Sequence, residues 1–303
     1  GSNVIAAGAS YTMTAQAVTF TAQWSGALIG VTYSIAGATT GVAPATQLIV
    51  PNTTVEVAPV VGISRSRFIF DAWSSGVDTF EPSETITPVS NIALAAVWVP
   101  EIPDAPIDTL TATSGAVTIE VGQGPGNGGV PTSYTVTASP SGAQCTVNSP
   151  ATSCTIAGLT NGTPYTFSVV ATNSSGSSTA TVSGPVTPAS VPSAPTSPVA
   201  TVDDGRATVS FTAPANSAAG NGGSAITSYS VTAYDSSGNA VTTCTVSAPA
   251  TSCVVTGLTN GTPYTYKVVA TNAIGSSTAS AASAAVTPAT VPGAPATVSA
   301  SAA

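Results

Sequence analysis

The chain has no histidine, and only four of its 303 residues are lysine or arginine. Charged residues make up 5% of the sequence, against about a quarter in ordinary globular domains. Four cations cannot neutralise a phosphate backbone or form a polybasic patch, so neither nucleic acid nor an acidic membrane surface is an expected partner. The longest apolar run, residues 92–99, is much shorter than the roughly 20 residues of a membrane-spanning helix, so no membrane insertion is expected in this segment.

The sequence also contains few of the residue types that support catalysis. General acid–base and nucleophilic catalysis depend on groups such as histidine or an activated cysteine, and the chain has no histidine and no cysteine beyond two apparent pairs. The twelve carboxylates fall mostly in predicted turns and linkers. A glycosidase pair would need two of them to converge in the folded chain, which the sequence does not predict. We therefore expect no enzyme, no catalytic residue, no metal site and no cofactor.

The four cysteines form two pairs with the same spacing. Cys145 and Cys154 bracket "TVNSPATS", and Cys244 and Cys253 bracket "TVSAPATS". A turn centred on the proline of each bracket would place the two cysteines opposite each other on the strands of a hairpin, which predicts a cross-strand disulfide in each copy. A zinc site is disfavoured because the pairs lie 99 positions apart and histidine is absent. Disulfides predict an oxidising, extracellular compartment.

A longer repeat surrounds these cysteines. The stretch "LTNGTPYTFSVVATN" at 159–173 returns as "LTNGTPYTYKVVATN" at 258–272. Its alternation places Tyr165, Phe167, Val169 and Ala171 on one face, which predicts a core strand. The hydroxyl of Tyr165, and that of Tyr264 in the second copy, is expected to reach back to the backbone at a structural corner.

These residues resemble the fibronectin type III family in its bacterial secreted form. The resemblance rests on "SYTVTA" and "LTNGTPYTFSVVATNSSGSS" in the first copy, "SYSVTA" and "LTNGTPYTYKVVATNAIGSS" in the second, and Pro-rich entries to both. It implies two β-sandwiches, at 100–189 and 190–289, of a family used as a general spacer and binding scaffold. Two features depart from the family: Val121 and Phe211 occupy the position of its usual core Trp, and neither copy contains an Arg-Gly-Asp tripeptide.

The first hundred residues resemble a Listeria–Bacteroides (internalin B-type) repeat. The carrying stretches are "GVTYSIAGATTGVAPA", "RFIFDAWSSG" and "ETITPVSNIALAAVW", with Trp73 and Trp98 at the family's aromatic positions. Residues 11–24 match residues 85–98, so 1–24 are expected to be the tail of a preceding repeat that docks on the repeat at 25–99 or on another chain. Residues 290–303 are expected to begin a further module. The expected fold is all-β, with one small β-grasp-like repeat followed by two fibronectin type III sandwiches.

Four local motifs have a functional and a structural interpretation. "GPGNGG" at 124–129 fits a dinucleotide glycine pattern, but it leads into a strand and is interpreted as a loop. Asp203-Asp204-Gly205 could offer calcium ligands but fits a tight hairpin turn better. Lys267 could form an isopeptide bond, although alternation directs it to solvent. The three tryptophans, the third being Trp24, could stack on sugars but are expected to close the core of their module.

Taken together, these features predict a non-enzymatic structural or adhesive stalk from a bacterial cell-surface or secreted multidomain protein. Pro-rich linkers at 99–106 and 187–198 favour semi-rigid connections and a rod-like array. The partner would be an unknown protein or glycan ligand. One alternative is an accessory spacer or carbohydrate-binding region of a secreted polysaccharide-degrading enzyme. Another is self-association along the array, because few charged residues guard the strand edges.

Overall fold

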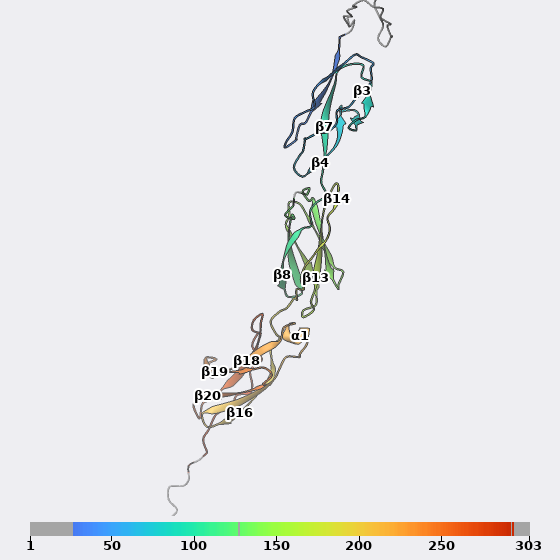
Figure 1. Cartoon of the computed structure of the whole chain (residues 1–303). Coiled ribbons are helices and arrows are strands. Elements are labelled where there is room, and N and C mark those ends of the chain that lie inside the picture. Colours follow the sequence, from blue (N-terminus) through green and yellow to red (C-terminus); the bar gives the residue numbers. More distant parts are fainter. Residues whose placement is uncertain (1–26, 127, 292, 294–303) are drawn as a thin grey trace, which may run out of the picture. The chain divides into compact units, whose positions relative to one another are not determined.

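The structure, a computed structural model, describes residues 27–126, 128–291 and 293, and the chain divides into two compact units between Val99 and Pro100. The tail and docking predicted for residues 1–24 lie outside the described residues, as do nearly all of residues 290–303. Figure 1 labels the main elements in chain order from blue to red. No helix among the described residues has the length and apolar character needed to cross a membrane.

The first unit contains a mixed five-stranded sheet of order β2-β1-β7-β4-β5, in which β1 runs parallel to β7. The strands β3 and β6 form a separate, antiparallel two-stranded sheet. The strands are β1 (Ile29–Ser34), β2 (Gln47–Ile49), β3 (Val55–Glu56), β4 (Phe68–Ser74), β5 (Thr79–Phe80), β6 (Thr85–Ile86) and β7 (Ile92–Pro100).

Trp73 is the centre of this unit's core. Its side chain is completely buried, and its indole N–H donates to the Ala58 carbonyl at 3.1 Å. The Tyr33 ring meets Trp73 edge-on at 5.0 Å, and the Tyr33 hydroxyl accepts a hydrogen bond from the Ala58 N–H. Trp98 is only half-buried and contacts Phe70 edge-on at 5.7 Å. Trp73 therefore closes the core as expected, whereas Trp98 lies outside the core cluster and contacts it through Phe70. Trp24 lies outside the described residues.

The first sandwich pairs two antiparallel sheets, β12-β9-β8 and β11-β10-β13 with β14 and β15 on the free side of β13 (Figure 1). The strands are β8 (Ile107–Thr113), β9 (Ala116–Gly122), β10 (Ser133–Ser139), β11 (Gln144–Asn148), β12 (Ser153–Ala157), β13 (Thr166–Asn173), β14 (Gly176–Ser177) and β15 (Thr181–Val182).

The second sandwich repeats this plan with sheets β16-β17-β20 and β19-β18-β21. Its elements are β16 (Thr196–Asp203), β17 (Arg206–Thr212), α1 (Ala218–Asn221), β18 (Ile226–Tyr234), β19 (Ala240–Ser247), β20 (Ser252–Thr256) and β21 (Thr265–Asn272). The single-turn helix α1 ends on the first two residues of the second "GNGG", at 220–223, and is the one helix among the described residues of an otherwise all-β chain.

Each sandwich has its own core, built from the inward faces of its alternating strands. Phe167, Val169 and Ala171 of β13 are completely buried, which confirms the predicted face. Val121 and Phe211, at the position of the family's usual Trp, are also buried, at 6% and 7% exposed. Smaller side chains thus fill both cores without the large indole.

Candidate functional site

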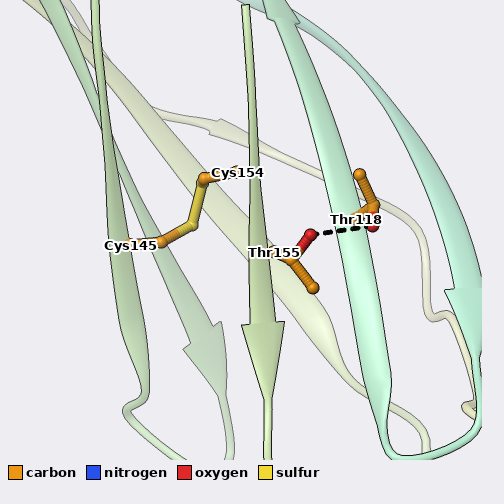
Figure 2. Close-up of a disulfide and its surroundings, with 4 residues drawn as sticks. All are labelled: Thr118, Cys145, Cys154 and Thr155. Atoms are coloured by element: carbon orange, nitrogen blue, oxygen red, sulfur yellow. Dashed lines mark hydrogen bonds between the residues drawn. A yellow bond between two sulfur atoms is a disulfide. The ribbon is translucent and has the colours of Figure 1, made fainter.

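The disulfides close one edge of each sandwich. Cys145 bonds Cys154 with a Cα–Cα separation of 6.2 Å, and Cys244 bonds Cys253 with a separation of 6.3 Å. Figure 2 shows the first pair reaching across from neighbouring strands, while Thr155 turns toward Thr118 and hydrogen-bonds it at 2.9 Å. Each bond therefore lies inside one module, at the edge of the fold.

The predicted hairpin around each bond is wrong, because the two strands belong to different sheets. The strand of Cys145, β11, pairs with β10, whereas the strand of Cys154, β12, pairs with β9. The bracket "TVNSPATS" therefore crosses from one sheet to the other instead of turning back within one sheet. Both cysteines lie on the inward faces of their strands, where the two sheets of a sandwich meet, and the disulfide joins the layers.

The corner tyrosines anchor the turn before the core strand. The Tyr165 hydroxyl accepts a hydrogen bond from the Thr160 N–H at 3.1 Å, and the Tyr264 hydroxyl accepts one from the Thr259 N–H at 3.2 Å. Both rings are buried, at 5% and 4% exposed. Each hydroxyl thus satisfies a backbone donor at the place where the chain leaves one sheet for the other.

The linker between the sandwiches is hydrogen-bonded to both of them. On the first sandwich, the Asn161 Nδ2 donates to the Ser190 Oγ, and the Gly162 N–H donates to the Pro188 carbonyl at 2.9 Å. On the second, the Asn272 Nδ2 donates to the Ser190 carbonyl at 2.8 Å, and the Ser190 N–H donates to the Gly222 carbonyl. Ser190 therefore contacts both modules.

The entry to the first sandwich is held in a similar way. The Asn173 Nδ2 donates to the Glu101 carbonyl, and the Gly128 N–H donates to the Asp104 carboxylate at 2.8 Å. A Cβ added at Gly126 would lie 2.5 Å from that carboxylate, and one at Gly128 would lie 2.7 Å from the Asp104 backbone nitrogen. The glycines of "GPGNGG" are explained by this close packing in a loop between β9 and β10.

The remaining motifs also have structural roles. Asp203 and Arg206 face each other across a two-residue turn that contains Asp204-Gly205, and they form a salt bridge. The hydrogen bond from Arg206 holds the pKa of Asp203 below its usual range. Lys267 is half-buried instead of fully solvated, and its ammonium lies 5.2 Å from the centroid of the Tyr234 ring.

Groups with shifted pKa values are scattered over the molecule. Burial raises the pKa of the Asp108 carboxyl, and the Asn239 backbone N–H lowers that of Asp235. Burial, with a smaller contribution from Tyr264, raises the pKa of Tyr266 to about 12. Within residues 27–126, 128–291 and 293, no three His, Cys, Asp or Glu side chains gather where they could hold a metal ion.

The structural features that recur in both copies are the inter-sheet disulfide, the tyrosine corner and the bonded linker. The residue pattern alone located the disulfides and the corners. It did not reveal the linker contacts of Asn173 and Asn272. Their signal was present in the repeated "VVATN", where the final asparagine is buried in both copies, at 7% and 4% exposed.

Comparisons with known proteins agree with this architecture. The fibronectin type III domain family matches residues 106–188 and 193–286, together more than half of the chain. No curated protein matches the chain.

Three solved structures are similar to parts of the chain. Domains A168–A170 of titin are 20% identical, with a TM-score of 0.41, covering 70% of this chain and 73% of that one. A two-domain fibronectin type III segment from chicken tenascin is 22% identical, with a TM-score of 0.32, covering 61% and 98%. The FN1–FN3 domains of chicken CNTN1 are 17% identical, with a TM-score of 0.39, covering 70% and 72%.

The family assignment rests on the family match, which spans both sandwiches. The matched residues include the corner tyrosines and the core strands that carry the sequence resemblance. The chain belongs to the fibronectin type III domain family, of which it contains two tandem members.

Proposed function

We propose that this chain is a non-enzymatic stalk segment of a bacterial cell-surface or secreted protein, which holds other domains of that protein at a distance. Tandem fibronectin type III domains are typical of structural, adhesive and spacer regions. The observation that carries the proposal is the linker, in which Ser190 is hydrogen-bonded to Asn161 of one sandwich and to Asn272 of the next. A spacer transmits position only if its joints resist bending, and such bonds restrict the joint.

Two further features support this proposal. The disulfides join the two sheets of each sandwich, which suits an oxidising compartment outside the cell. Among the residues that the structure describes, the other buried ones are apolar packing residues, backbone-bonded serines and the two linker-binding asparagines. A stalk needs stable modules more than it needs a reactive site.

We assign residues 25–99 to a Listeria–Bacteroides type repeat and the two sandwiches to 100–189 and 190–289. Trp73 at the centre of the first unit's core supports the assignment of the repeat. An unknown protein or glycan ligand would be bound by the stalk or by the domains that it carries. The parent gene on both sides of this segment would distinguish an adhesin, which ends in an anchoring signal, from a polysaccharide-degrading enzyme, which contains a catalytic domain.

The stiffness of the joint can be tested in solution on the whole chain. Residual dipolar couplings from both sandwiches should fit one alignment tensor if the linker holds them together. Inserting the four residues Gly-Ser-Gly-Ser after Ser190 should leave both sandwiches folded and produce two tensors, which makes this variant the matched control. Small-angle scattering should give a radius of gyration clearly above about 19 Å, the value for a compact globule of this length. Two tensors in the unmodified chain, or a globular radius, would refute the stalk.

A further inference from the structure

The segment that follows β21 runs beside that strand without forming a strand itself. Within it, Ser277, Ser280 and Ser283 are buried, at 8%, 6% and 8% exposed, and both residues after each of these serines are exposed. The burial period is therefore three, whereas a β-strand has a period of two. This serine segment, residues 277–285, covers the side of β21 that does not pair with β18.

Each serine makes two hydrogen bonds to one residue of β21. The N–H groups of Ser277, Ser280 and Ser283 donate to the carbonyls of Ala270, Val268 and Tyr266 at 2.8, 2.9 and 2.9 Å. The same three residues of β21 donate their own N–H groups to the serine Oγ atoms, each at 3.0 Å. In an ordinary antiparallel ladder, a backbone carbonyl would accept those N–H groups. In the serine segment, the serine Oγ takes the place of the backbone carbonyl as acceptor.

The hydroxyl protons are also used. Each serine Oγ donates to the carbonyl of the next residue, namely Thr278, Ala281 or Ala284, at 2.7–2.8 Å. Three residues of the serine segment accompany two residues of β21 at each step. The outer side of the segment consequently lacks the row of N–H and C=O groups, at strand spacing, that would template another strand.

The first sandwich shows a related arrangement independently. Ser178 exchanges the same pair of bonds with Ala171, and Ser183 exchanges them with Phe167. Between them, Val169 pairs with Thr181 of the two-residue strand β15. The hydroxyl ladder therefore belongs to the plan of both modules, and the second module uses it without interruption.

Without the serine segment, the free side of β21 would be prone to pair with a strand of another chain. The β21 sequence "TYKVVATN" is rich in β-branched and aromatic residues, and it contains one charge. Tandem copies of a module place many identical edges at high local concentration, and the few charges of this chain cannot keep them apart.

We propose that the three serines lock the free side of β21 against strand addition by a second copy of the chain. The serine hydroxyls accept hydrogen bonds from the N–H groups of β21. The period of three leaves no row of backbone N–H and C=O groups at strand spacing on the outer side of the serine segment, so a further strand has nothing to pair with. The lock argues against lateral strand pairing at this edge as a mode of assembly. The inference does not depend on the stalk role.

Amide hydrogen exchange of the whole oxidised chain tests the bonds one at a time. Ser280→Ala removes the acceptor of the Val268 N–H and should speed exchange of that amide about fivefold to tenfold, the factor corresponding to one ordinary hydrogen bond. The amides of Tyr266 and Ala270 should change less. Ser276→Ala is the matched control, because its exposed hydroxyl bonds only the Thr271 side chain at 2.9 Å, and it should leave all three amides unchanged.

Self-association tests the consequence. The triple variant Ser277→Ala, Ser280→Ala and Ser283→Ala should form oligomers in sedimentation velocity and bind thioflavin T, whereas the parent chain and the Ser276→Ala control should remain monomeric. A folded triple variant that stays monomeric would overturn the proposed lock. Should the triple variant fail to fold, the Ser280→Ala exchange decides: unchanged exchange of Val268 refutes the hydroxyl ladder, and selective acceleration supports it.

Discussion

Two tyrosines in the second sandwich should respond differently to the same substitution: Tyr264→Phe should destabilise the module, and Tyr266→Phe should not. The Tyr264 hydroxyl accepts the Thr259 N–H, and its ring is 4% exposed. Tyr266, two residues later, is completely buried, and its hydroxyl has no hydrogen-bond partner among the described residues. The first sandwich contains tyrosine at the equivalent of 264 and phenylalanine, Phe167, at the equivalent of 266. The repeat thus contains the second substitution already.

The expected magnitudes follow from these contacts. Tyr264→Phe removes a hydrogen bond whose net value is about 1 kcal/mol. Tyr266→Phe removes a buried hydroxyl that costs about 1–3 kcal/mol when it is not hydrogen-bonded, so this variant should be at least as stable as the parent. For a module of this size, about 1 kcal/mol shifts the melting temperature by about 5 °C. The first variant should therefore melt about 5 °C lower, and the second should melt at the same temperature or higher.

Differential scanning calorimetry of the whole chain measures both effects. Tyr165→Phe makes the same corner change in the first sandwich, so it identifies which transition belongs to which module. A Tyr266→Phe variant that is destabilised as much as Tyr264→Phe would refute the reasoning, because it would mean that the Tyr266 hydroxyl has a partner in solution.

Three further predictions concern pH, the disulfides and the first unit. The second sandwich should lose stability as the pH rises from about 10 to 12, because tyrosine in the unfolded chain releases its proton near 10 while burial holds the pKa of Tyr266 at about 12. Below pH 10 this tyrosine adds no pH dependence to the stability. In urea titrations, the Tyr266→Phe variant should lose less stability over the same pH range. Replacing Cys145 and Cys154 with serine should cost the first sandwich about 2–3 kcal/mol, and non-reducing peptide mapping of the parent should find no bond between modules. Trp73→Ala should cost about 3–5 kcal/mol, abolishing the first unit's transition while both sandwich transitions remain; an unchanged near-ultraviolet circular dichroism spectrum would contradict this.

The faces of the core strands that are buried could be predicted from the residue pattern. The alternation around Phe167 and Val169 was sufficient, because successive side chains of a strand must point to opposite sides. It also paired the cysteines correctly within each module, because the spacing of nine residues repeats in both copies. The tight turn at Asp204-Gly205 likewise followed from local backbone preferences.

The pairing of the strands, by contrast, could not be predicted from the residue pattern and is known from the folded chain. The sequence around Cys145 and Cys154 fits a hairpin as well as a crossing between sheets, because alternation fixes the face of a residue but not its partner strand. Partner choice depends on contacts far apart in the chain, such as β11 with β10 and β12 with β9. For the same reason, the hydrogen bonds of Ser190 and of the serine segment could not be predicted. The period of three in that segment can be interpreted only once the segment is seen to lie beside β21. Their hydroxyls and amides acquire a role when a distant backbone group needs a hydrogen-bond partner, and folding alone brings that group into reach.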